Sequence, residues 1–265
     1  MTTVADIRDS LLRRVPAYMK LDFDNVGHLV GRGDREVQRL LVALDITLPV
    51  IAEAKAFGAQ LILSHHPVIF HEIKQLTDGD LTGQKVLALV ESGIAAICLH
   101  TNLDTVEGGV NDALLAALGA PAGEMIAPHG SHPDGQPFGM CRVGELPQEI
   151  SLAQFLEQVR VGLSANGLRY HDAGRPVRKI GCCGGAGASF LLPAIQAGCD
   201  TFVTGDVKYD QFLDAKALGI NLIDADHFCT EQVVVPVLRD LVLAEFPHLE
   251  VRMSQVHGQT TQFIL

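Results

Sequence analysis

The sequence predicts an α/β fold, with two similar α/β units and mostly parallel sheets. Short apolar runs of strand length alternate with segments of helical length along most of the chain, a rhythm typical of strands joined by crossover helices. Glycines follow several helical segments at the position that ends a helix. The 265 residues are 48% hydrophobic and 19% charged, which is the balance of a folded chain with one large or two small cores.

The first half begins with a helix and continues through three strands. Pro16 breaks the chain after the first helix, Pro49 suits the first turn of the second helix, and Gly58 suits its end. A turn-rich loop at 20–34 precedes the first strand. We expect helices at 1–14, 49–57, 83–91 and 110–118, and strands at 39–44, 60–63 and 94–99.

The second half resumes this alternation after a break. Residues 120–137 are rich in Pro, Gly and His and suggest a linker or an exposed excursion. We expect helices at 152–161, 190–197, 209–218 and 228–245, and strands at 139–143, 168–170, 177–183, 201–204, 221–225 and 251–253. The predicted division is a first unit at 1–124, a linker at 125–138 and a second unit at 139–265, packed as one compact chain.

The two halves resemble each other. The stretch 39–64 runs through a strand, a helix, a glycine turn and a second strand, and 178–204 follows the same order. A Gly-Ile pair, at 93–94 and at 219–220, then opens the next strand in each half. We infer an internal duplication, with the two units facing each other across a cleft. The alternative is that the common α/β rhythm alone produces part of this match.

Composition argues against several classes of function. The formal net charge is −11 and no basic block occurs, so nucleic acid is an unlikely partner. No apolar run reaches membrane-spanning length, and the first residues favour an amphipathic helix over a signal peptide. The six cysteines form no CxxC pair. We interpret them as buried reduced thiols of a cytoplasmic protein, with disulfides or a thiolate zinc site as the less favoured alternative.

Polar residues with metal-ligand chemistry follow three of the predicted strands. His65 and His66 end the strand 60–63, just before Pro67, and His100 ends the strand 94–99. Ligands bind at the carboxyl ends of strands in open α/β sheets. The alternative for the His-His pair is a polar loop with two solvated imidazoles. For His100 the alternatives are an outer partner of a metal site and a plain surface residue.

The third strand end carries His227 and Glu231, four residues apart. On a helix starting near His227 the two lie on one face, and a glutamate in so apolar a helix is costly to bury unless it is paired. Asp104 offers a further carboxylate, with a helix cap as its alternative role. The other histidines are treated as ordinary; they include His71, His129, His132, His171, His248 and His257.

These candidates form a mixed nitrogen and oxygen ligand set without thiolates. Such a set suits two ions of Zn, Mn, Fe or Co in an open, catalytic type of site. Glu231 is the natural bridge, because a carboxylate has two oxygens. His66 and His227 would complete one ion, and His65 and Asp104 the other.

An ordered series of motifs along nearly the whole chain resembles the NIF3-like family, also called the GTP cyclohydrolase I type 2 homologues. The motifs are Asp24-Asn-Val-Gly27, Ser64-His-His-Pro67 with Val68-Ile-Phe70, His100-Thr-Asn-Leu-Asp104, Phe138–Leu146, Thr204-Gly-Asp-Val207 and Asp224–Glu231.

The resemblance implies a dinuclear metal site between two similar α/β units. The family's ligand positions fall here on His65, His66, Asp104, His227 and Glu231, the five residues that spacing suggests. The resemblance also implies a homohexameric ring built from dimers. Some relatives carry an inserted ferredoxin-like domain, but only 120–137 occupies its place here. Two residues depart from the family pattern: Asp226 replaces the usual Gly before the ligand histidine, and His28 replaces an apolar residue.

The favoured function is a metal-dependent hydrolase that acts on a nucleotide-like or other small substrate. The alternative is a non-catalytic metal-binding, metal-delivery or adaptor protein that works as an oligomeric ring. For a proton donor in catalysis, His100 and Asp206 are the candidates. The glycine-rich stretch 181–187 is interpreted as a tight turn, with a phosphate-binding loop as the alternative.

Overall fold

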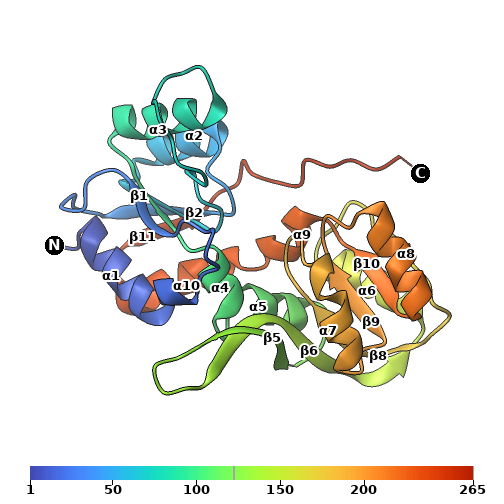
Figure 1. Ribbon diagram of the computed structural model, residues 1–265. Helices are drawn as coiled ribbons and strands as arrows, with labels where there is room; N and C mark the ends of the chain where they lie inside the picture. Colours follow the sequence, from blue (N-terminus) through green and yellow to red (C-terminus); the bar gives the residue numbers. More distant parts are fainter. Residues whose placement is uncertain (122, 265) are drawn as a thin grey trace. The chain divides into compact units, whose positions relative to one another are not determined.

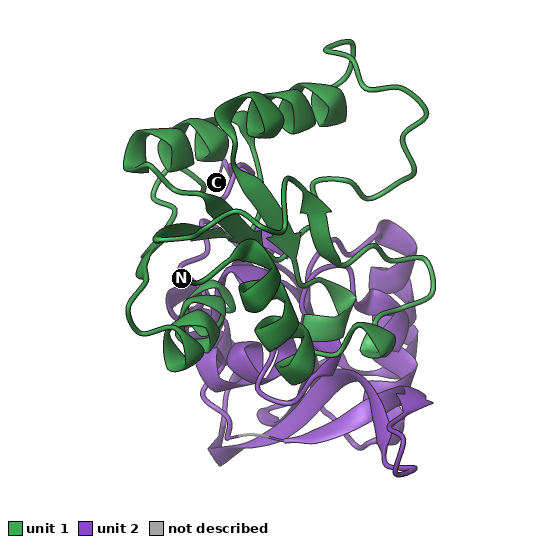
Figure 2. Ribbon diagram, turned by 90° about the vertical axis from the view of Figure 1, so that its left-hand side faces the viewer, with its two compact units in different colours: residues 1–103, 234–258 green, residues 104–233, 259–265 purple. Residues whose placement is uncertain are grey.

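The computed structural model describes residues 1–121 and 123–264. The chain forms two compact units, which Figure 2 distinguishes by colour. Unit 1 comprises residues 1–103 and 234–258, and unit 2 comprises residues 104–233 and the C-terminal residues from 259. The chain passes from unit 1 to unit 2 within the short helix α4 (Thr101–Thr105).

Unit 1 contains a five-stranded sheet in the order β1-β4-β3-β2-β11. All neighbouring strands are parallel except the edge strand β1, which is antiparallel to β4. The strands are β1 (Gly27–Val30), β2 (Arg39–Ala43), β3 (Leu61–Ser64), β4 (Ala95–Cys98) and β11 (Glu250–Met253). Strands β2, β3 and β4 read as nearly continuous apolar runs because helices cover both faces of the sheet.

Local chemistry explains where the helices of unit 1 begin and end. Figure 1 shows α2 and α3 on one face of the sheet and α1 and α10 on the other. Thr47 caps α2, and Gly58 ends it in the left-handed conformation at φ 73°. The helices are α1 (Val4–Arg14), η1 (Ala17–Met19), α2 (Leu48–Phe57), α3 (Leu81–Ser92) and α10 (Val235–Glu245).

Unit 2 contains a six-stranded sheet in the order β5-β6-β8-β9-β10-β7. Only the central strands β8, β9 and β10 are parallel to one another, whereas β5, β6 and β7 pair antiparallel. The prediction of mostly parallel sheets therefore holds for unit 1 but is wrong for unit 2. The strands are β5 (Glu124–Ser131), β6 (Pro137–Ile150), β7 (Arg169–His171), β8 (Val177–Cys182), β9 (Thr201–Thr204) and β10 (Asn221–Asp224).

Helices cover both faces of this second sheet as well. Figure 1 shows α7 and α8 in front of the strands and α6 behind them. Apolar residues of α5 and α6 join β8, β9 and β10 in one buried cluster around Phe155. The helices are α5 (Val110–Ala117), α6 (Leu152–Gly162), η2 (Ala188–Phe190), α7 (Leu191–Gln196), α8 (Tyr209–Leu218) and α9 (His227–Gln232).

The structure divides the chain differently from the predicted units at 1–124 and 139–265. The expected linker at 125–138 is a β-hairpin, since β5 and the first residues of β6 pair with each other. Pro128 is tolerated in β5 because this strand lies at the edge of the sheet. The C-terminal segment 234–258 belongs to unit 1, where β11 extends the sheet beside β2.

The helix predicted at 228–245 is in fact two helices. Helix α9 ends at Gln232 and α10 begins at Val235, with Pro236 in its first turn. Proline has no backbone N–H to donate to the preceding turn, so it suits a helix start rather than a helix interior. The break also marks a passage between units, because α9 belongs to unit 2 and α10 to unit 1.

The two units share an order of elements. Unit 1 runs α1-β1-β2-α2-β3-α3-β4, and unit 2 runs α6-β7-β8-α7-β9-α8-β10. The strand pairings also correspond, because β1 lies antiparallel beside β4 just as β7 lies antiparallel beside β10. This correspondence supports the inferred duplication, to which the hairpin β5-β6 and the strand β11 are additions.

Candidate metal centre

Unit 1 gathers three imidazoles where β3 and β4 end. His65 and His66 directly follow Ser64, the last residue of β3, and His100 stands two residues after β4. Their ring centroids are 4.9 Å apart for His65 and His66, 5.2 Å for His65 and His100, and 5.5 Å for His66 and His100. One ring nitrogen from each lies within 4.8 Å of the other two. The structure thus confirms that adjacent parallel strands bring these histidines together.

Each of these imidazoles is held through its Nδ1 atom by an oxygen of unit 1. His65 Nδ1 lies 2.9 Å from the carbonyl oxygen of Leu99. His66 Nδ1 lies 2.8 Å from Asp45 Oδ1, and His100 Nδ1 lies 2.7 Å from Asp24 Oδ1. Carbonyl and carboxylate oxygens only accept, so Nδ1 is the donor in each bond and Nε2 is the ring nitrogen left to face a metal ion. Metal-ligating histidines are oriented in this way.

Asp45 holds two imidazoles at once. Its second oxygen lies 2.7 Å from Nε2 of His257, a histidine that the sequence led us to treat as ordinary. Burial alone would raise the pKa of Asp45, but hydrogen bonds from His257 and His66 outweigh burial and lower it well below its usual value. Asp45 is therefore ionised at neutral pH and can stabilise an imidazole that binds a cation.

Asp24 is the corresponding carboxylate behind His100, and its side chain has no exposed surface. It also accepts hydrogen bonds from the backbone N–H and the hydroxyl of Thr101. Burial alone would raise the pKa of Asp24. The hydrogen bonds from His100 and Thr101 outweigh burial and lower this pKa from its usual value to about 2. The side chain of His100 is only 16% exposed, which rules out the plain surface role considered for it.

Unit 2 gathers one imidazole and two carboxylates. His227 begins α9, and its Nε2 lies 3.0 Å from Oε2 of Glu231, one turn later. A carboxylate oxygen of Asp104 lies within 4.8 Å of one from Glu231. Both acids are buried, at 5% and 3% exposure. The structure confirms that His227 and Glu231 lie on one face of their helix. The N-cap of α5 is Gly109, so Asp104 does not have the alternative role of a helix cap.

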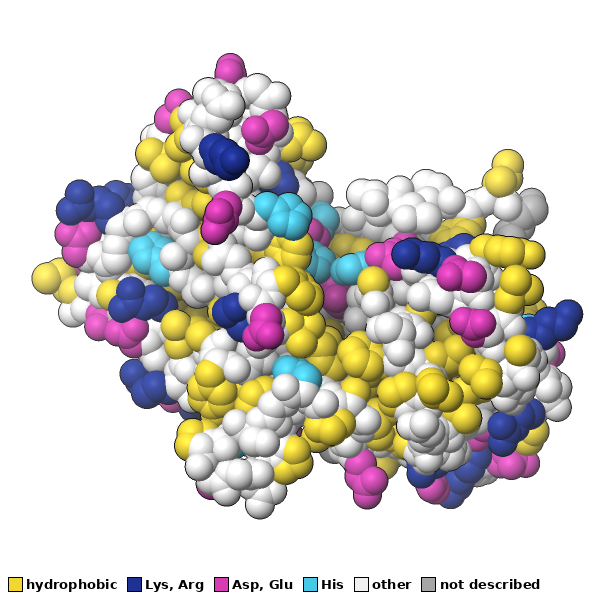
Figure 3. Space-filling model, viewed as in Figure 1, with side chains coloured by type: hydrophobic (Ala, Val, Ile, Leu, Met, Phe, Trp, Pro, Cys, Tyr) yellow, Lys and Arg dark blue, Asp and Glu magenta, His cyan; other side chains and the backbone are white. Residues whose placement is uncertain are grey.

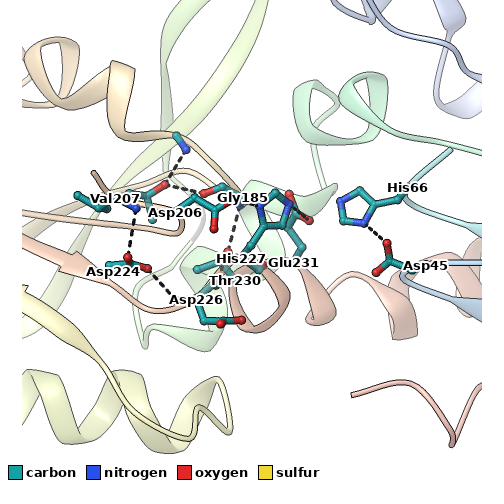
Figure 4. Close-up of polar contacts among 12 residues, drawn as sticks. Asp45, His66, Gly185, Asp206, Val207, Asp224, Asp226, His227, Thr230 and Glu231 are labelled. Carbon is teal, nitrogen blue, oxygen red and sulfur yellow. Dashed lines mark hydrogen bonds and ion pairs between the residues drawn. The ribbon is translucent and has the colours of Figure 1, made fainter. Parts of the chain in front are cut away.

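The turn after β9 holds the imidazole of His227. Asp206 Oδ2 lies 2.7 Å from His227 Nδ1, so this aspartate orients the histidine (Figure 4). Asp206 adopts a positive φ of 53° and Asp226, just before His227, one of 70°. Glycine is the residue that suits such a backbone. The departure noted at Asp226 therefore falls where the chain takes a conformation that favours glycine.

The glycine-rich turn after β8 packs directly against Glu231. A Cβ atom on Gly185 would lie 2.3 Å from Glu231 Oε1 and 3.1 Å from the ring of His227. The N–H groups of Gly184, Gly185 and Gly187 donate to Asn111 Oδ1, Thr230 Oγ1 and Thr204 Oγ1 respectively. Because these donors are used inside the protein, the stretch is a tight turn and not a phosphate-binding loop.

Two buried residues fix the backbone around Asp104. Asn111 Nδ2 donates to the carbonyl oxygen of Asp104 at 2.8 Å, and Asn111 is 1% exposed. The guanidinium of Arg142 donates to the carbonyl of Thr105 at 3.1 Å and to both oxygens of Asp112. The sequence reasoning missed Asn111 and Arg142, because neither belongs to a ligand pattern and both act through distant backbone.

The cysteines take no part in either group of ligands. All six are free and buried. Burial raises the pKa of Cys199 to about 11 and of Cys229 to about 12, which keeps these thiols protonated and poor as ligands. The donors in both units are imidazole nitrogens and carboxylate oxygens, and this set fits a divalent transition-metal ion.

On the face drawn in Figure 3, basic and acidic side chains are interspersed over each unit. Within residues 1–121 and 123–264, no helix is long and apolar enough to cross a membrane.

The chain matches known proteins along most of its length. A protein from Clostridium perfringens named GTP cyclohydrolase 1 type 2 homolog is 36% identical over 221 residues, which are 83% of each chain. One of the same name from Streptomyces coelicolor is 32% identical, over 87% of this chain and 82% of that one.

Solved structures show the same fold. A Staphylococcus aureus protein superposes with a TM-score of 0.92 at 29% identity, over 99% of both chains. A Bacillus cereus protein related to NIF3 superposes with a TM-score of 0.94 at 23% identity, over the whole of both chains. The family model for Duf34/NIF3 (NGG1p interacting factor 3) matches residues 2–260. The chain therefore belongs to the DUF34/NIF3 family.

Proposed function

We propose that this protein is a metal-dependent hydrolase with a dinuclear centre, acting on a nucleotide-like or other small substrate. Its ligands are His65 and His66 from unit 1 and Asp104, His227 and Glu231 from unit 2. One observation carries the proposal: each of the three ligand imidazoles has its Nδ1 bonded to a carbonyl or carboxylate oxygen. Imidazoles prepared in this way are typical of metal sites.

Burial of the two carboxylates supports the same conclusion. Asp104 and Glu231 are at most 5% exposed and their oxygens lie within 4.8 Å of each other. Two negative charges at this distance repel strongly where water is largely excluded. A divalent cation offsets that repulsion, and Glu231, with two oxygens, is suited to bridge a pair of ions.

Two divalent ions in such a centre supply Lewis acidity to a carbonyl, ring C–N or phosphoryl bond and lower the pKa of a water molecule. The protein's own residues supply the rest. Asp45 and Asp206 fix the tautomer and direction of His66 and His227, and the close packing of Gly185 keeps water away from one side of Glu231. Curated relatives carry the name GTP cyclohydrolase 1 type 2 homolog, which makes a nucleotide the first substrate class to test.

The test measures metal content and turnover on the same samples. Purified protein, stripped with chelator and reloaded with Zn²⁺, Mn²⁺, Fe²⁺ or Co²⁺, is expected to hold two ions per chain and to hydrolyse a member of a panel of nucleotides and phosphoesters. Glu231→Gln is expected to lose both the bound ions and the hydrolysis. Glu149→Gln, which changes an exposed glutamate of the same unit, is expected to keep both.

Two results would contradict the proposal. Equal product from wild type and Glu231→Gln would place the chemistry elsewhere. Two bound ions without turnover on any substrate of the panel would instead favour the metal-storage, metal-delivery or adaptor function considered above.

We also propose that the protein assembles into a homohexameric ring, as the family resemblance implies. Light scattering on the eluate of a sizing column should then give about six times the 28.4 kDa mass of the chain. A monomeric mass at micromolar concentration would contradict the ring.

A further inference from the structure

We propose that Phe23 and Phe70 of unit 1 form an aromatic platform on which a planar heteroaromatic ring, such as a nucleobase, stacks beside the candidate metal centre. The proposal rests on the proposed function, because it narrows the small substrate to one that carries such a ring. The platform consists of the rings of these two phenylalanines, and it adds no ligand to the metal centre.

The exposure of both rings is the first support. Phe23 lies in the loop before β1 and is 66% exposed, and Phe70 lies in the loop after β3 and is 38% exposed. The two rings meet at a centroid distance of 6.1 Å, with their planes inclined by 72°. Single exposed apolar residues are common, but exposed aromatic rings in contact with each other are typical of binding sites. Because an edge-to-face pair covers only one face of one ring, aromatic surface remains for a third ring.

The position of Phe70 is the second support. Its ring meets that of His71 at a centroid distance of 4.7 Å and that of His100 at 5.9 Å. The ring of His100 in turn lies 5.2 Å from that of His65 and 5.5 Å from that of His66. A ligand ring stacked on Phe70, at the usual centroid distance of about 4.5–7 Å, would therefore lie close to the proposed ligand histidines. The rest of a small substrate can reach the metal centre from there.

The hydrogen bonds that hold the two loops are the third support. Asn25 Nδ2 donates to the carbonyl oxygen of Ile69 at 2.7 Å, which joins the loop before β1 to the loop after β3. In the first of these loops, Asp24 Oδ1 lies 2.7 Å from Nδ1 of His100. The loop before β1 is thus fixed both to the loop of Phe70 and to the imidazoles. A platform that is fixed before binding loses less conformational entropy when a ligand binds.

The physical basis of stacking determines which ligands the platform accepts. Aromatic side chains stack on every base, because every base has a π face, and each stacked base adds about 5–100-fold in affinity. The platform therefore predicts strong selection for substrates that carry a planar ring over substrates that lack one. It predicts only weak selection between one base and another.

The experiment compares two ligands that share a ribose phosphate and differ in the base. Full-length protein loaded with Zn²⁺ is titrated calorimetrically with guanosine 5′-monophosphate and with ribose 5-phosphate. We expect the nucleotide to bind about 5–100-fold more tightly than the sugar phosphate. Adenosine 5′-monophosphate should bind within about 5-fold of the guanosine nucleotide, since stacking tolerates either base.

Substitutions of the two phenylalanines test the platform itself. Phe70→Leu and Phe23→Leu keep an apolar side chain but remove the π face, so each should lower the preference for the nucleotide by about 5-fold or more. Elemental analysis should give both variants the metal content of the wild type. Phe70→Tyr keeps an aromatic face and should keep the preference.

Phe246→Leu is the matched control. The ring of Phe246 also meets a histidine of unit 1, His248, at a centroid distance of 6.4 Å. Phe246 precedes β11, whose first residue pairs with the first residue of β2, so it lies at the end of the sheet opposite to the metal centre. This variant should keep both the metal content and the preference for the nucleotide.

The outcomes separate the platform from the proposed hydrolase. Equal affinities of the wild type for the two ligands, with turnover on the substrate panel, would overturn the platform and leave the hydrolase standing. A preference for the nucleotide that Phe70→Leu removes, without turnover on any substrate, would support the platform and contradict the hydrolase. An unchanged preference in both leucine variants, with a smaller mass than the wild type by light scattering, would assign the two rings to a contact between copies of the chain and overturn the platform.

Discussion

Unit 1 and unit 2 both place residues of their candidate sites after equivalent strands, but the types of residue at those positions differ. His66, a proposed ligand, stands two residues beyond β3, whereas Asp206, which is hydrogen-bonded to the proposed ligand His227, stands two residues beyond β9. Two residues beyond β2 stands Asp45, and beyond β8 the corresponding position is Gly184. The shared topology fixes where side chains are presented, and the residues at those positions decide which chemical groups each unit offers.

The difference extends to how each unit supports its ligands. Unit 1 places the carboxylates Asp24 and Asp45 behind its imidazoles. Unit 2 also holds its imidazole with a carboxylate, Asp206, but in addition it packs glycine backbone against Glu231, since no side chain fits between Gly185 and Glu231. Loss of a ligand or of its support should therefore have different consequences in the two units, and four comparisons of variants test this.

The largest effect is expected from the proposed bridging residue. Glu231→Gln should weaken binding of both ions by about 100-fold or more, since losing even an outer partner costs about 10–100-fold. His66→Ala, in unit 1, should weaken chiefly one ion. Elemental analysis at a fixed free-metal concentration measures both variants, and equal losses from the two would remove the special role of Glu231.

The glycine support of unit 2 should fail when a methyl group is added. Gly185→Ala places a carbon 2.3 Å from Glu231 Oε1 at a φ of 62°, so we expect a metal affinity lower by about 10-fold or more and a strain of about 1 kcal/mol. Gly219→Ala, at φ 71° with no atom within 4 Å, carries the backbone strain alone. Equal metal affinities in the two variants would contradict the close contact as a support.

The two orienting aspartates should differ in importance. Asp45→Asn disturbs both His66 and His257, whereas Asp206→Asn disturbs only His227 among the contacts described. Each should lower metal affinity by about 10–100-fold, with Asp45→Asn the more harmful. Competition with a coloured chelator measures both, and Asp210→Asn, an exposed site in unit 2, is the control. A larger loss for Asp206→Asn would reverse this ranking.

The smallest effect is expected at Asp226. This residue holds φ 70° and ψ 142°, a conformation that costs a non-glycine residue about 1–3 kcal/mol. Asp226→Gly should remove that strain and raise the unfolding free energy by about 1 kcal/mol, seen as a higher melting temperature. Asp226→Ala keeps the strained backbone and serves as the comparison, so equal melting temperatures would show that the backbone is not the cause.

The sequence alone predicted those features of the fold and of the candidate site that depend on residues close together in the chain. The strand before His65, the helix 209–218, the role of Pro49 and Gly58 at the ends of α2, and the one-turn spacing of His227 and Glu231 all follow from neighbouring residues, and the structure confirms them. Alternation of strands and helices likewise sufficed for the fold class.

Features set by distant residues were not predictable. The pairing of β11 with β2 joins residues more than 200 positions apart and returns the C-terminal segment to unit 1. The hydrogen bonds between Asp45 and His257 and between Gly184 and Asn111 also join residues far apart in the sequence, so no local pattern predicts them. The short edge strand β1 lacks an apolar pattern, and the hairpin of β5 and β6 was hidden by its Pro and Gly content, which an edge position tolerates.

The turn formed by Gly184, Gly185 and Gly187 has a consequence for the behaviour of the protein without metal. Its amide hydrogens are tied to α5, α9 and β9 by Asn111, Thr230 and Thr204, and all three of these bonds are buried. Such amides exchange with solvent only when the surrounding segment opens. Unit 2 would then keep the side chain of Glu231 in place in the apoprotein, so that a cation would bind to a preformed site and would not have to order its ligands.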